Sequence, residues 1–484
     1  MGGELASYDR ALIFGVYTAI NVIVFISGVL IFMMQAGFML LETGAMSRKN
    51  AINNIFKNFI DLCVCGIFFY WFGYPIVQGD SIVVDWMRDL GFANRIESNS
   101  PGPVVSLNSD IALFFNFAFA ATCVTICSGA VTGRIATYAY LVFGAVFSAF
   151  VYPIVAFTVW NADGLLHGVL HDFAGSVVVH ALGGFAGLAG AIMLRPRIGE
   201  FGYGKGQVDA FRFAGSSVSN ASHNIPLSAL GVFMLWIGWY GFNAGSTFAA
   251  GFDLSGIDLS GAMVAPEQFA DAVFNQLVDG FGTVIINTTL APCAAVFAVM
   301  AFFIVKQEKL YISDMLNGAL AGLVGITANA DAATAAQAMV IGVISGFVYI
   351  LTVMALYKAK IDDPVGAFPV HGTTGVMAAG LFALTTGSME TGPTVFGTQI
   401  FYAAMIAAFG FFSALITFWI SSRIMYVIKV LGKSKHFDYG LMPRNHLRVT
   451  PEQELAGMDK EIHGQDAYAI HINAPGKLQT ARGN

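Results

Sequence analysis

Charged residues are scarce in this sequence: Asp, Glu, Lys and Arg make up only 11% of its 484 residues. Soluble globular proteins carry about 25% charged residues, so this composition excludes an ordinary soluble domain. Hydrophobic residues reach 56% instead, in runs that repeatedly match the roughly 20 residues a membrane-spanning helix needs. We therefore expect one membrane domain over residues 1–430 and a polar tail over residues 431–484.

Long basic segments are also missing, and the formal net charge is −6. Without a basic arm or patch, we expect no nucleic-acid partner. A short cleavable signal peptide is not expected either, because the first apolar run is too long for one.

Cysteine is rare, with five residues that all lie within apolar runs: Cys63, Cys65, Cys123, Cys127 and Cys293. Their surroundings predict small buried side chains rather than disulfide or metal chemistry. A zinc site needs three or four protein ligands. No third His, Cys or carboxylate stands at helical spacing from His180 or His371, so we expect neither a metal nor another cofactor.

Eleven apolar segments predict an all-α polytopic membrane protein with 11 transmembrane helices. They lie at 12–42, 52–78, 111–130, 136–159, 176–194, 225–249, 282–305, 312–328, 335–357, 369–386 and 398–429. The first and the last exceed the thickness of a bilayer, so we expect them to tilt or to project into water.

Basic residues favour alternate connections between these segments. If the N-terminus lies outside, the inner connections hold most of them, from Arg48 to the tail that begins at Arg423. The outer connections hold only Arg88 and Arg95, and residues 250–281 contain no Lys or Arg. Because inner loops concentrate Lys and Arg, this pattern predicts the N-terminus outside and the C-terminus inside.

One pattern of acid and histidine occurs twice. Asp172 and Asp363 each begin the sequence D-x-x-G-x-x-x-V-H, which ends on His180 and on His371. An Asp at a helix start accepts hydrogen bonds from unpaired N–H groups, and eight residues rise roughly 12 Å along a helix. Each histidine should therefore lie well inside the apolar layer.

The two copies open the fifth and the tenth segments. An odd number of spans in each half turns the second half upside down, so the two elements would enter from opposite faces. Such inverted repeats hold their site near the middle of the membrane, between the halves. We predict an inverted 5+5 repeat, with the eleventh segment bracing the outside of the bundle.

Ionisable side chains within a membrane are costly and usually functional. Inside the spans we identify Glu42 and Lys57 near helix ends, and His180 and His371 deeper. Two histidines at matching positions favour a shared proton or a path for a small polar molecule over packing alone. Ser176 lies one helical turn before His180, but no acid or oxyanion partner accompanies it, which argues against an intramembrane enzyme.

Aromatic residues stand near span ends or beside small residues, at Phe115, Phe119, Tyr152, Trp160, Trp239 and Phe242. Such rings belong either to the aromatic belt at a membrane interface or to a site whose ring faces attract a small cation, by about 0.5–2 kcal/mol. Ser246, one helical turn beyond Phe242, adds a hydrogen-bonding oxygen.

Five stretches, in order, resemble the ammonium transporter (Amt/Mep/Rh) family, and its bacterial Amt members above all, over roughly residues 10–470. They are QAGFMLLETG (35–44) with Arg48-Lys-Asn50, the element from Asp172 to His180, GWYGFNAGS (238–246), DDPVGAFPVHG (362–372) and GMDKEIHGQDAY (457–468).

The resemblance implies a site, position by position. Trp160, Phe119 and Ser246 match the external site that recruits ammonium, and Asp172 matches the acid that supports it. Phe119 and Phe242 match the stacked rings that gate the pore.

Further inside, His180 and His371 match the twin histidines of a hydrophobic channel, and Tyr152 and Trp239 match residues that support the vestibule. The mechanism implied is recruitment of ammonium, its deprotonation, and conduction of ammonia through the pore.

The resemblance also implies partners and a location. The substrate would be ammonium or ammonia, with methylammonium as a second substrate, and the protein a homotrimer in the cell inner (plasma) membrane with a PII-type regulator at its cytoplasmic tail. Two functions stay open, a transporter and an ammonium sensor that signals through the tail; neither is an enzyme. Ser176, Thr373 and Thr374 depart from the family pattern, and the two threonines are expected near the pore.

Overall fold

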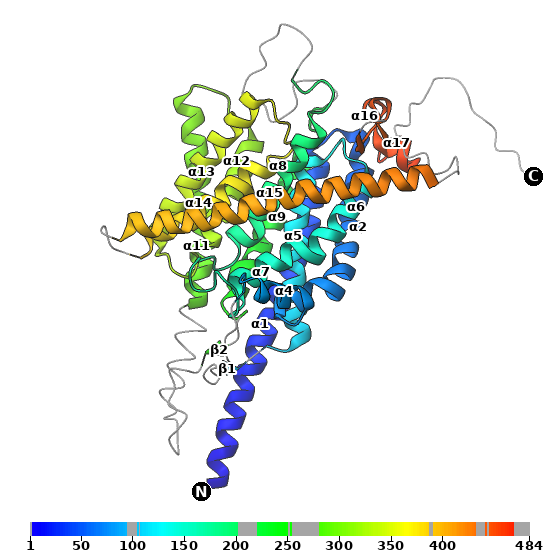
Figure 1. Cartoon of the computed structure of the whole chain (residues 1–484). Helices are drawn as coiled ribbons and strands as arrows, with labels where there is room; N and C mark the ends of the chain where they lie inside the picture. The colour runs from blue at the N-terminus through cyan, green and yellow to red at the C-terminus, as the bar shows by residue number, and fades with distance from the viewer. Residues whose placement is uncertain are drawn as a thin grey trace, which may run out of the picture.

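The computed structural model shows a helical bundle (Figure 1). It describes residues 2–93, 104–105, 107–201, 220–249, 252–253, 280–386, 391–431, 441–442 and 445–468. Most of the predicted outer connection at 250–281 lies outside the described residues, as does Arg95.

The helices of the first half are α1 (Gly2–Ala45), α2 (Ala51–Phe68), α3 (Tyr74–Gln78), α4 (Ile82–Asp89), α5 (Ser109–Val131), α6 (Thr137–Val146), α7 (Tyr152–Trp160) and α8 (Leu182–Leu194). Those of the second half are α9 (Ile225–Ser246), α11 (Phe281–Val305), α12 (Ile312–Thr327), α13 (Ala335–Ala359), α14 (Thr374–Leu381) and α15 (Gly392–Leu431). The tail holds β3 (Leu441–Met442), β4 (Asn445–Val449), α16 (Pro451–Ala456) and α17 (Met458–His463). Two antiparallel pairs form, β3 with β4 and β1 (Val104–Val105) with β2 (Phe252–Asp253).

Each of the eleven predicted segments falls on a helix. Within the described residues, nine helical segments are long and apolar enough to cross a membrane. Two shorter apolar segments, Ile312–Thr327 and Phe368–Leu384, correspond to the predicted spans 312–328 and 369–386. The chain is thus a multi-pass helical membrane protein, and its number of crossings depends on the two shorter segments.

Four of the predicted spans contain a π-helical turn that the sequence pattern does not reveal. The turns lie at Phe69–Gly73, Phe147–Val151, Ser176–Ala181 and Phe368–Thr373. Pro75 and Pro153 follow the first two turns; because proline lacks an N–H, a carbonyl of the preceding turn loses its usual partner and the helix is distorted there. The other two turns carry His180 and His371, and π-helical turns are frequent at functional sites.

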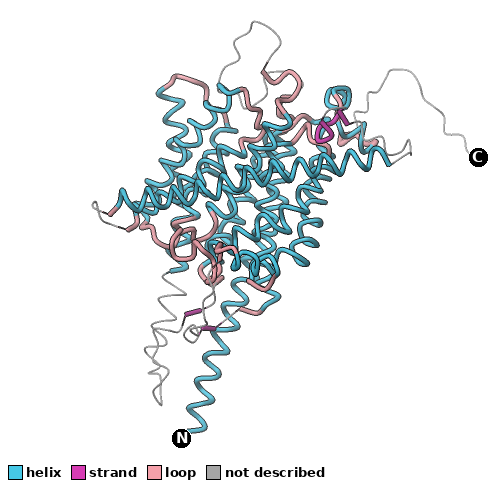
Figure 2. The backbone as a smooth tube through the Cα atoms, in the orientation of Figure 1, coloured by secondary structure: helices cyan, strands magenta, loops and turns pink. Residues whose placement is uncertain are grey.

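The first and last long helices extend beyond the others. α15 crosses the outside of the bundle obliquely (Figure 1), and its 40 residues span about 60 Å at 1.5 Å per residue. Because a bilayer core is about 30 Å thick, this helix must tilt steeply or leave the apolar layer. α1 projects from the bundle at its N-terminal end (Figure 2).

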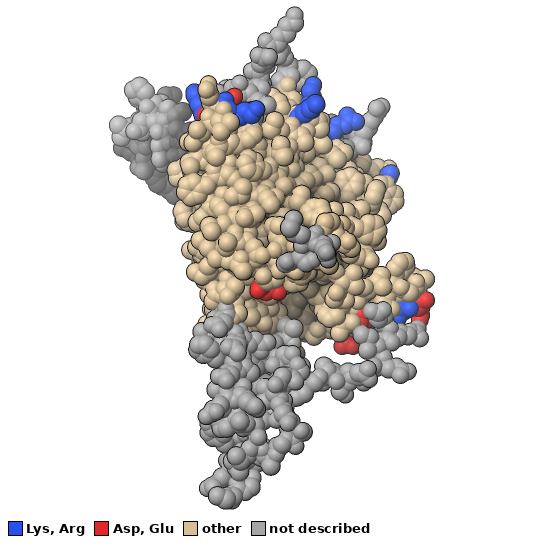
Figure 3. Space-filling model, turned by 90° about the vertical axis from the view of Figure 1, so that its left-hand side faces the viewer, with Lys and Arg blue, Asp and Glu red and all other residues tan. Residues whose placement is uncertain are grey.

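Charge is unevenly distributed over the surface. On the face in Figure 3, most Lys and Arg side chains gather at the upper end, above a broad band with hardly any charge. Large apolar side chains are exposed along the helices, for example Phe233 and Ile237 of α9 and Phe297 of α11. Such a continuous apolar surface is suited to contact with lipid.

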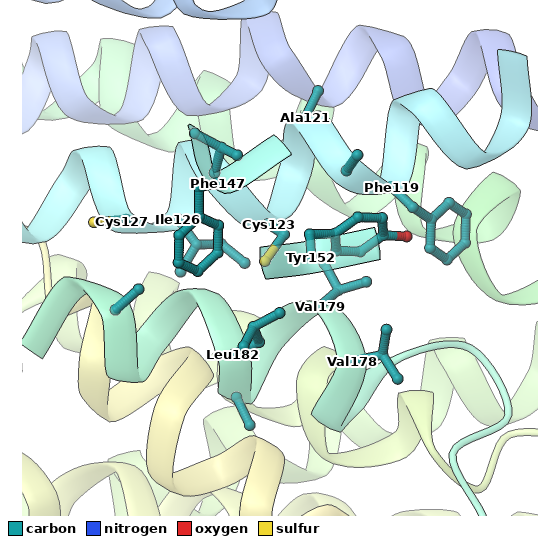
Figure 4. Packing of buried hydrophobic residues seen from close by; sticks show 14 of the residues in the cluster. Phe119, Ala121, Cys123, Ile126, Cys127, Phe147, Tyr152, Val178, Val179 and Leu182 are labelled. Atoms are coloured by element: carbon teal, nitrogen blue, oxygen red, sulfur yellow. The ribbon is translucent and has the colours of Figure 1, made fainter. Parts of the chain in front are cut away.

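The core is packed where α5, α8 and the π-helical turn Phe147–Val151 meet, and Figure 4 shows Cys123, Ile126, Phe147 and Leu182 directed toward one another there. Cys65 and Cys127 are buried as well. The prediction of buried cysteines was wrong for two of the five, because Cys63 and Cys293 are exposed on outward faces of α2 and α11.

Candidate functional site

Asp172 caps the helical segment that carries His180, as the sequence predicts. Its Oδ2 accepts hydrogen bonds from the backbone N–H groups of Val177 (2.9 Å) and Val178 (2.8 Å). Gly175 has a φ of 104°, a left-handed conformation open to glycine, which bends the chain so that these N–H groups face the carboxylate.

Asp363 caps the matching segment in the same way. Its Oδ1 accepts from the N–H groups of Gly366 (3.1 Å) and Ala367 (3.0 Å), and its Oδ2 from that of Phe368 (2.7 Å). Gly366, the counterpart of Gly175, also has a positive φ, of 75°. The repeated sequence therefore folds into a repeated local structure.

The two histidines meet. Their Nδ1 atoms lie 3.1 Å apart, and their ring centroids 5.1 Å apart at an interplanar angle of 19°. Both His180 and His371 are buried. At this separation one Nδ1 donates and the other accepts, so two neutral rings share one proton.

Glycines four residues after each histidine allow this approach. A Cβ atom on Gly184 would collide with the backbone nitrogen of Gly372, and one on Gly375 with the carbonyl oxygen of Ser176. Each histidine segment thus rests on the main chain of the other.

Stacked aromatic rings lie next to the histidines. Phe119 of α5 and Phe242 of α9 are 4.0 Å apart at 24°, and the Phe242 ring lies 5.3 Å from that of His180. Trp239 stacks on His180 at 4.9 Å and donates to Thr327 Oγ1 at 2.8 Å. The structure therefore places Trp239 against the histidine, one level deeper than the vestibule it was expected to support.

A cavity of about 550 Å³, the large cavity, opens on the other side of the phenylalanine pair. Phe119, Trp160, Asp172 and Ser246, four of the predicted residues, line it together. Trp160 meets Phe119 edge-on at 6.0 Å, and its Nε1 donates to the Asp172 carbonyl at 2.8 Å. The Ser246 hydroxyl donates to the Phe242 carbonyl at 2.8 Å, which leaves its oxygen free to accept from a ligand.

The second carboxylate oxygen of Asp172, Oδ1, takes no part in the helix cap. Oδ1 is buried and has no hydrogen-bond partner among the described residues. Burial raises the pKa of Asp172 to about 6, against the lowering effect of the backbone N–H groups of Val178, Val177 and Ser176 and of His171. At neutral pH the acid is therefore mostly ionised, and its negative charge lies beside the large cavity although Oδ1 itself is covered.

Tyr152 lies behind the phenylalanine pair. It is fully buried and packs near Phe119, Cys123 and Val178, with its hydroxyl directed toward Phe119 (Figure 4). That hydroxyl has no partner among the residues the structure describes. Tyr152 supports Phe119 from within the core and does not line the large cavity.

Sequence reasoning missed several polar residues that line the large cavity: Asn116, His167, His171 and Gln399. His171 Nε2 lies 3.2 Å from Asp331 Oδ1, and its ring stacks on Phe382 at 3.9 Å. Polar residues are ordinary in connections, so only the position of His171 directly before Asp172 offered a signal.

Two acids inside the spans were also missed. Asp61 of α2 and Asp314 of α12 are buried and accept hydrogen bonds from Tyr140 (3.3 Å) and Tyr349 (3.1 Å). A search of each apolar segment for single carboxylates would have found both.

The three residues that depart from the resemblance all donate to main-chain carbonyls. The hydroxyls of Thr373 and Thr374 both donate to the Pro369 carbonyl, at 3.2 and 2.9 Å, so they turn back onto the main chain. Ser176 donates to the Val324 carbonyl at 2.7 Å and forms no nucleophile–base pair with His180. Within the part of the chain that the structure describes, no three His, Cys, Asp or Glu side chains are grouped to hold a metal.

The tail packs against the membrane domain. The two carboxylate oxygens of Asp459 accept from the N–H groups of Asn53 (2.8 Å) and Ile52 (3.0 Å) at the start of α2. Arg448 donates to the Leu194 carbonyl at 2.6 Å, at the end of α8. Residues far apart in the sequence thus join the tail to two helices of the first half.

Known proteins resemble this chain over most of its length. The model of the Ammonium Transporter Family matches residues 22–468. A putative ammonium transporter of Synechocystis sp. is 35% identical over 459 residues, which are 94% of this chain and 90% of that protein. Ammonium transporter Amt2 of Archaeoglobus fulgidus is 33% identical over 482 residues, covering 94% and 89%.

Two solved structures share the fold. One is named "Sensor Amt Protein"; it has a TM-score of 0.71 and 28% identity, over 92% of this chain and 98% of that one. Saccharomyces cerevisiae Mep2 has a TM-score of 0.65 over 90% of both chains, and at 21% identity it shows the fold alone.

Proposed function

The chain belongs to the ammonium transporter family, and from that membership we propose that it carries ammonium across a membrane. Ammonium binds in the large cavity, gives up its proton to the solvent there, and passes as ammonia between the phenylalanines and along the two histidines. The observation that carries this proposal is the unbroken series of contacts from Trp160 to Phe119, Phe242, His180 and His371. The relatives are named transporters and not enzymes.

The large cavity suits a small cation. The faces and edges of Trp160 and Phe119 border it together with the Ser246 oxygen, and aromatic faces attract cations by about 0.5–2 kcal/mol. The unpartnered Oδ1 of Asp172 adds a negative charge. Ammonium can donate an N–H bond to the Ser246 oxygen and is attracted by the nearby charge of Asp172, whereas potassium has no hydrogen to donate.

The path beyond the gate suits a neutral molecule. Phe119, Phe242 and Trp239 are almost fully buried, and a bare cation would lose its hydration there at a large cost. Potassium cannot shed its charge, but ammonium becomes ammonia on deprotonation. Because the two Nδ1 atoms share one proton, one Nε2 carries a hydrogen and the other does not, so the two rings together offer the passing ammonia a donor and an acceptor.

The proposal includes the arrangement in the membrane. All eleven helical segments cross it, as two inverted halves of five with α15 outside, the N-terminus out and the C-terminus in. The matching caps of Asp172 and Asp363 support the repeat. We also infer a homotrimer in the plasma membrane, whose docked tail is the contact for a PII-type regulator.

The tail offers a test of its own. Deleting residues 457–484 removes the Asp459 cap of α2, so we expect the ammonium flux to change while ammonium binding persists. Unchanged flux in the truncated protein would exclude a regulatory role for this contact.

The transport proposal is tested by an ammonium pulse on proteoliposomes, with potassium as the comparison cation. We expect a saturating response to ammonium and none to potassium, lost in Asp172→Ala and reduced in His180→Ala. A current would show that the proton also crosses the membrane. Internal alkalinisation without current would mean that neutral ammonia passes without its proton.

A sensor is the second candidate, because the similar solved structure at 28% identity is named a sensor. Both functions need the same cavity, so net flux separates them. Saturable ammonium binding with neither current nor alkalinisation would identify this chain as a sensor.

A further inference from the structure

Two basic residues near the C-terminal end of α15 lack a negatively charged partner. Arg423 and Lys429 form no salt bridge with any carboxylate among the described residues. The Arg423 guanidinium lies over the Trp419 ring instead, 5.4 Å from the ring centroid. Two positive charges are therefore open to an anion from outside this part of the chain.

This end of α15 lies on the face of the membrane domain opposite the large cavity. Gln399, near the start of α15, lines that cavity, and the 24 residues from Gln399 to Arg423 rise about 36 Å along a helix. A bilayer core is about 30 Å thick. Arg423 therefore lies at the opposite border of the apolar layer, at the level of lipid headgroups.

The tail strand β4 adds a third basic residue, His446. Strand β4 packs against α15, and the His446 ring lies 5.2 Å from the Tyr426 ring of α15, at 39°. Desolvation and the positive charges of Lys429 and Arg423 lower the pKa of His446. Both charges are thus close enough to act on this histidine, and we call Arg423, Lys429 and His446 the basic cluster.

Aromatic and apolar side chains surround the basic cluster. Trp419 and Tyr426 are 54% and 47% exposed, and such rings concentrate at the border between lipid and water. The end of α15 also exposes large apolar side chains, namely Val427, Ile428, Val430 and Leu431. A soluble anion would use only the charges, whereas an anionic lipid offers a phosphate to the charges and acyl chains to the apolar surface.

We propose that the basic cluster binds the phosphate headgroup of an anionic lipid, in the leaflet on the side of the tail. Arg423 and Lys429 hold the phosphate, and the acyl chains lie along Trp419 and the exposed apolar side chains. Basic residues just beyond a membrane-spanning helix attract anionic lipids in this way. The bound lipid joins α15 to β4 of the tail. This inference uses the membrane-spanning character of α15 and not transport, so it can fail while the proposed function stands.

The first test measures the affinity of the delipidated protein for phosphatidylglycerol by native mass spectrometry, with zwitterionic phosphatidylcholine for comparison. Arg423→Gln combined with Lys429→Gln removes both charges. We expect phosphatidylglycerol to bind about 30-fold more weakly, the combined value of two basic residues at an anionic surface. Phosphatidylcholine should bind as it does to the wild-type protein.

The matched control removes two charges from another helix end. Lys306 follows α11 and lies over the Phe302 ring at 6.0 Å, and Lys306 and Lys309 are both exposed. Lys306→Gln combined with Lys309→Gln should change the affinity for phosphatidylglycerol less than about threefold, because salt screens charges distant from the site. Equal losses in the two double variants would reflect net charge alone and overturn the proposal.

A competition experiment distinguishes a lipid from a free phosphate. Inorganic phosphate in large excess should not displace phosphatidylglycerol from the wild-type protein, because it lacks the acyl chains that contact the apolar surface. Displacement of the lipid by inorganic phosphate would identify a site for soluble anions and overturn the assignment to a lipid.

The second test locates the lipid by quenching of tryptophan fluorescence with brominated acyl chains. Brominated phosphatidylglycerol should quench the wild-type protein more strongly than brominated phosphatidylcholine. This excess should disappear in Trp419→Phe, which keeps an aromatic ring for Arg423. Trp71 and Trp86 are also exposed but distant from the basic cluster, so they should respond equally to both lipids. An excess retained in Trp419→Phe would place the lipid elsewhere and contradict the proposal.

A protein partner is the competing occupant of this surface. Size-exclusion chromatography of each variant verifies that it is folded and reports its oligomeric state. A changed oligomeric state in the Arg423→Gln/Lys429→Gln protein, with unchanged lipid affinity, would assign the surface to a contact between proteins and exclude the lipid site.

Discussion

Asp172 and Asp363 occupy the same position of a repeated element and cap the same kind of helix start, yet their surroundings differ. Asp172 uses one oxygen for its two backbone bonds and keeps Oδ1 unpartnered at the large cavity. Asp363 uses both oxygens for three backbone bonds and does not line the large cavity.

The neighbours of Asp363 confirm its structural role. Asp362 beside it accepts from the Arg197 guanidinium at 2.8 and 2.9 Å, and its carbonyl accepts from Arg134 at 2.7 Å. Burial raises the pKa of both Asp172 and Asp363 to about 6, so the pKa does not distinguish them. The difference lies in a single oxygen, and duplication of a scaffold does not duplicate the site built on it.

The largest expected effect comes from exchanging each acid for its amide. Asp172→Asn keeps an oxygen for the helix cap but loses the charge at the large cavity, so ammonium flux should fall about 100-fold, as for a lost bond to a charged group. Asp363→Asn should lower stability and leave the flux within about threefold of wild type. Measured side by side in proteoliposomes, equal losses in the two variants would contradict the assigned difference.

Lowering the pH should weaken ammonium binding through Asp172 but not through Asp363. We expect this effect to be smaller than that of the amide substitutions. With a pKa of about 6, Asp172 is roughly one-tenth ionised at pH 5, so ammonium binding should weaken about tenfold between pH 7 and pH 5. The Asp363→Asn protein should show the same profile. Isothermal titration at several pH values checks this, and a profile that is altered in Asp363→Asn but retained in Asp172→Asn would refute it.

The stability of the fold should increase at low pH, whereas ammonium binding should weaken. The folded pKa of about 6 for Asp363 exceeds the usual value near 3.9, so the folded state holds the proton more tightly than the unfolded state. Stability should therefore rise as the pH falls from about 6 to about 4. Thermal unfolding of Asp363→Asn should show a smaller rise than the wild-type protein.

The smallest expected effect comes from making the two elements alike. Ser176 and Ala367 occupy matching positions, and only Ser176 bonds across to α12, at the Val324 carbonyl. Ser176→Ala should lower the free energy of unfolding by about 1 kcal/mol, the value of a neutral hydrogen bond, with unchanged flux. Loss of flux without loss of stability would instead place the Ser176 hydroxyl on the path.

The repeated frame explains why so much of the site could be predicted. Its spacing alone located the two acids at helix starts and the two histidines deep in the bundle, because a cap and a helical rise are local properties. Phe119, Trp160 and Ser246 followed from the family resemblance, and the structure brings them together at one cavity.

Other features depend on how helices meet, which spacing does not reveal. The stacking of Trp239 on His180 depends on where α9 crosses the segment that carries His180. Asp331 reaches His171 from a distant part of the sequence, and the burial of Asp61 depends on Tyr140 of α6. Glu42 was noticed as a charge near a helix end, but only the packed structure places it beside His371.

The contacts at Gly184 and Gly375 limit how this protein can evolve. The spacing between the His180 and His371 segments is set by main-chain atoms of one segment that lie against main-chain atoms of the other. No substitution can trim a backbone nitrogen or carbonyl, so selection cannot widen this constriction one residue at a time. If the chain conducts ammonia as we propose, divergence in rate and in substrate preference must arise at the two ends of the path, because the main-chain contacts fix its middle.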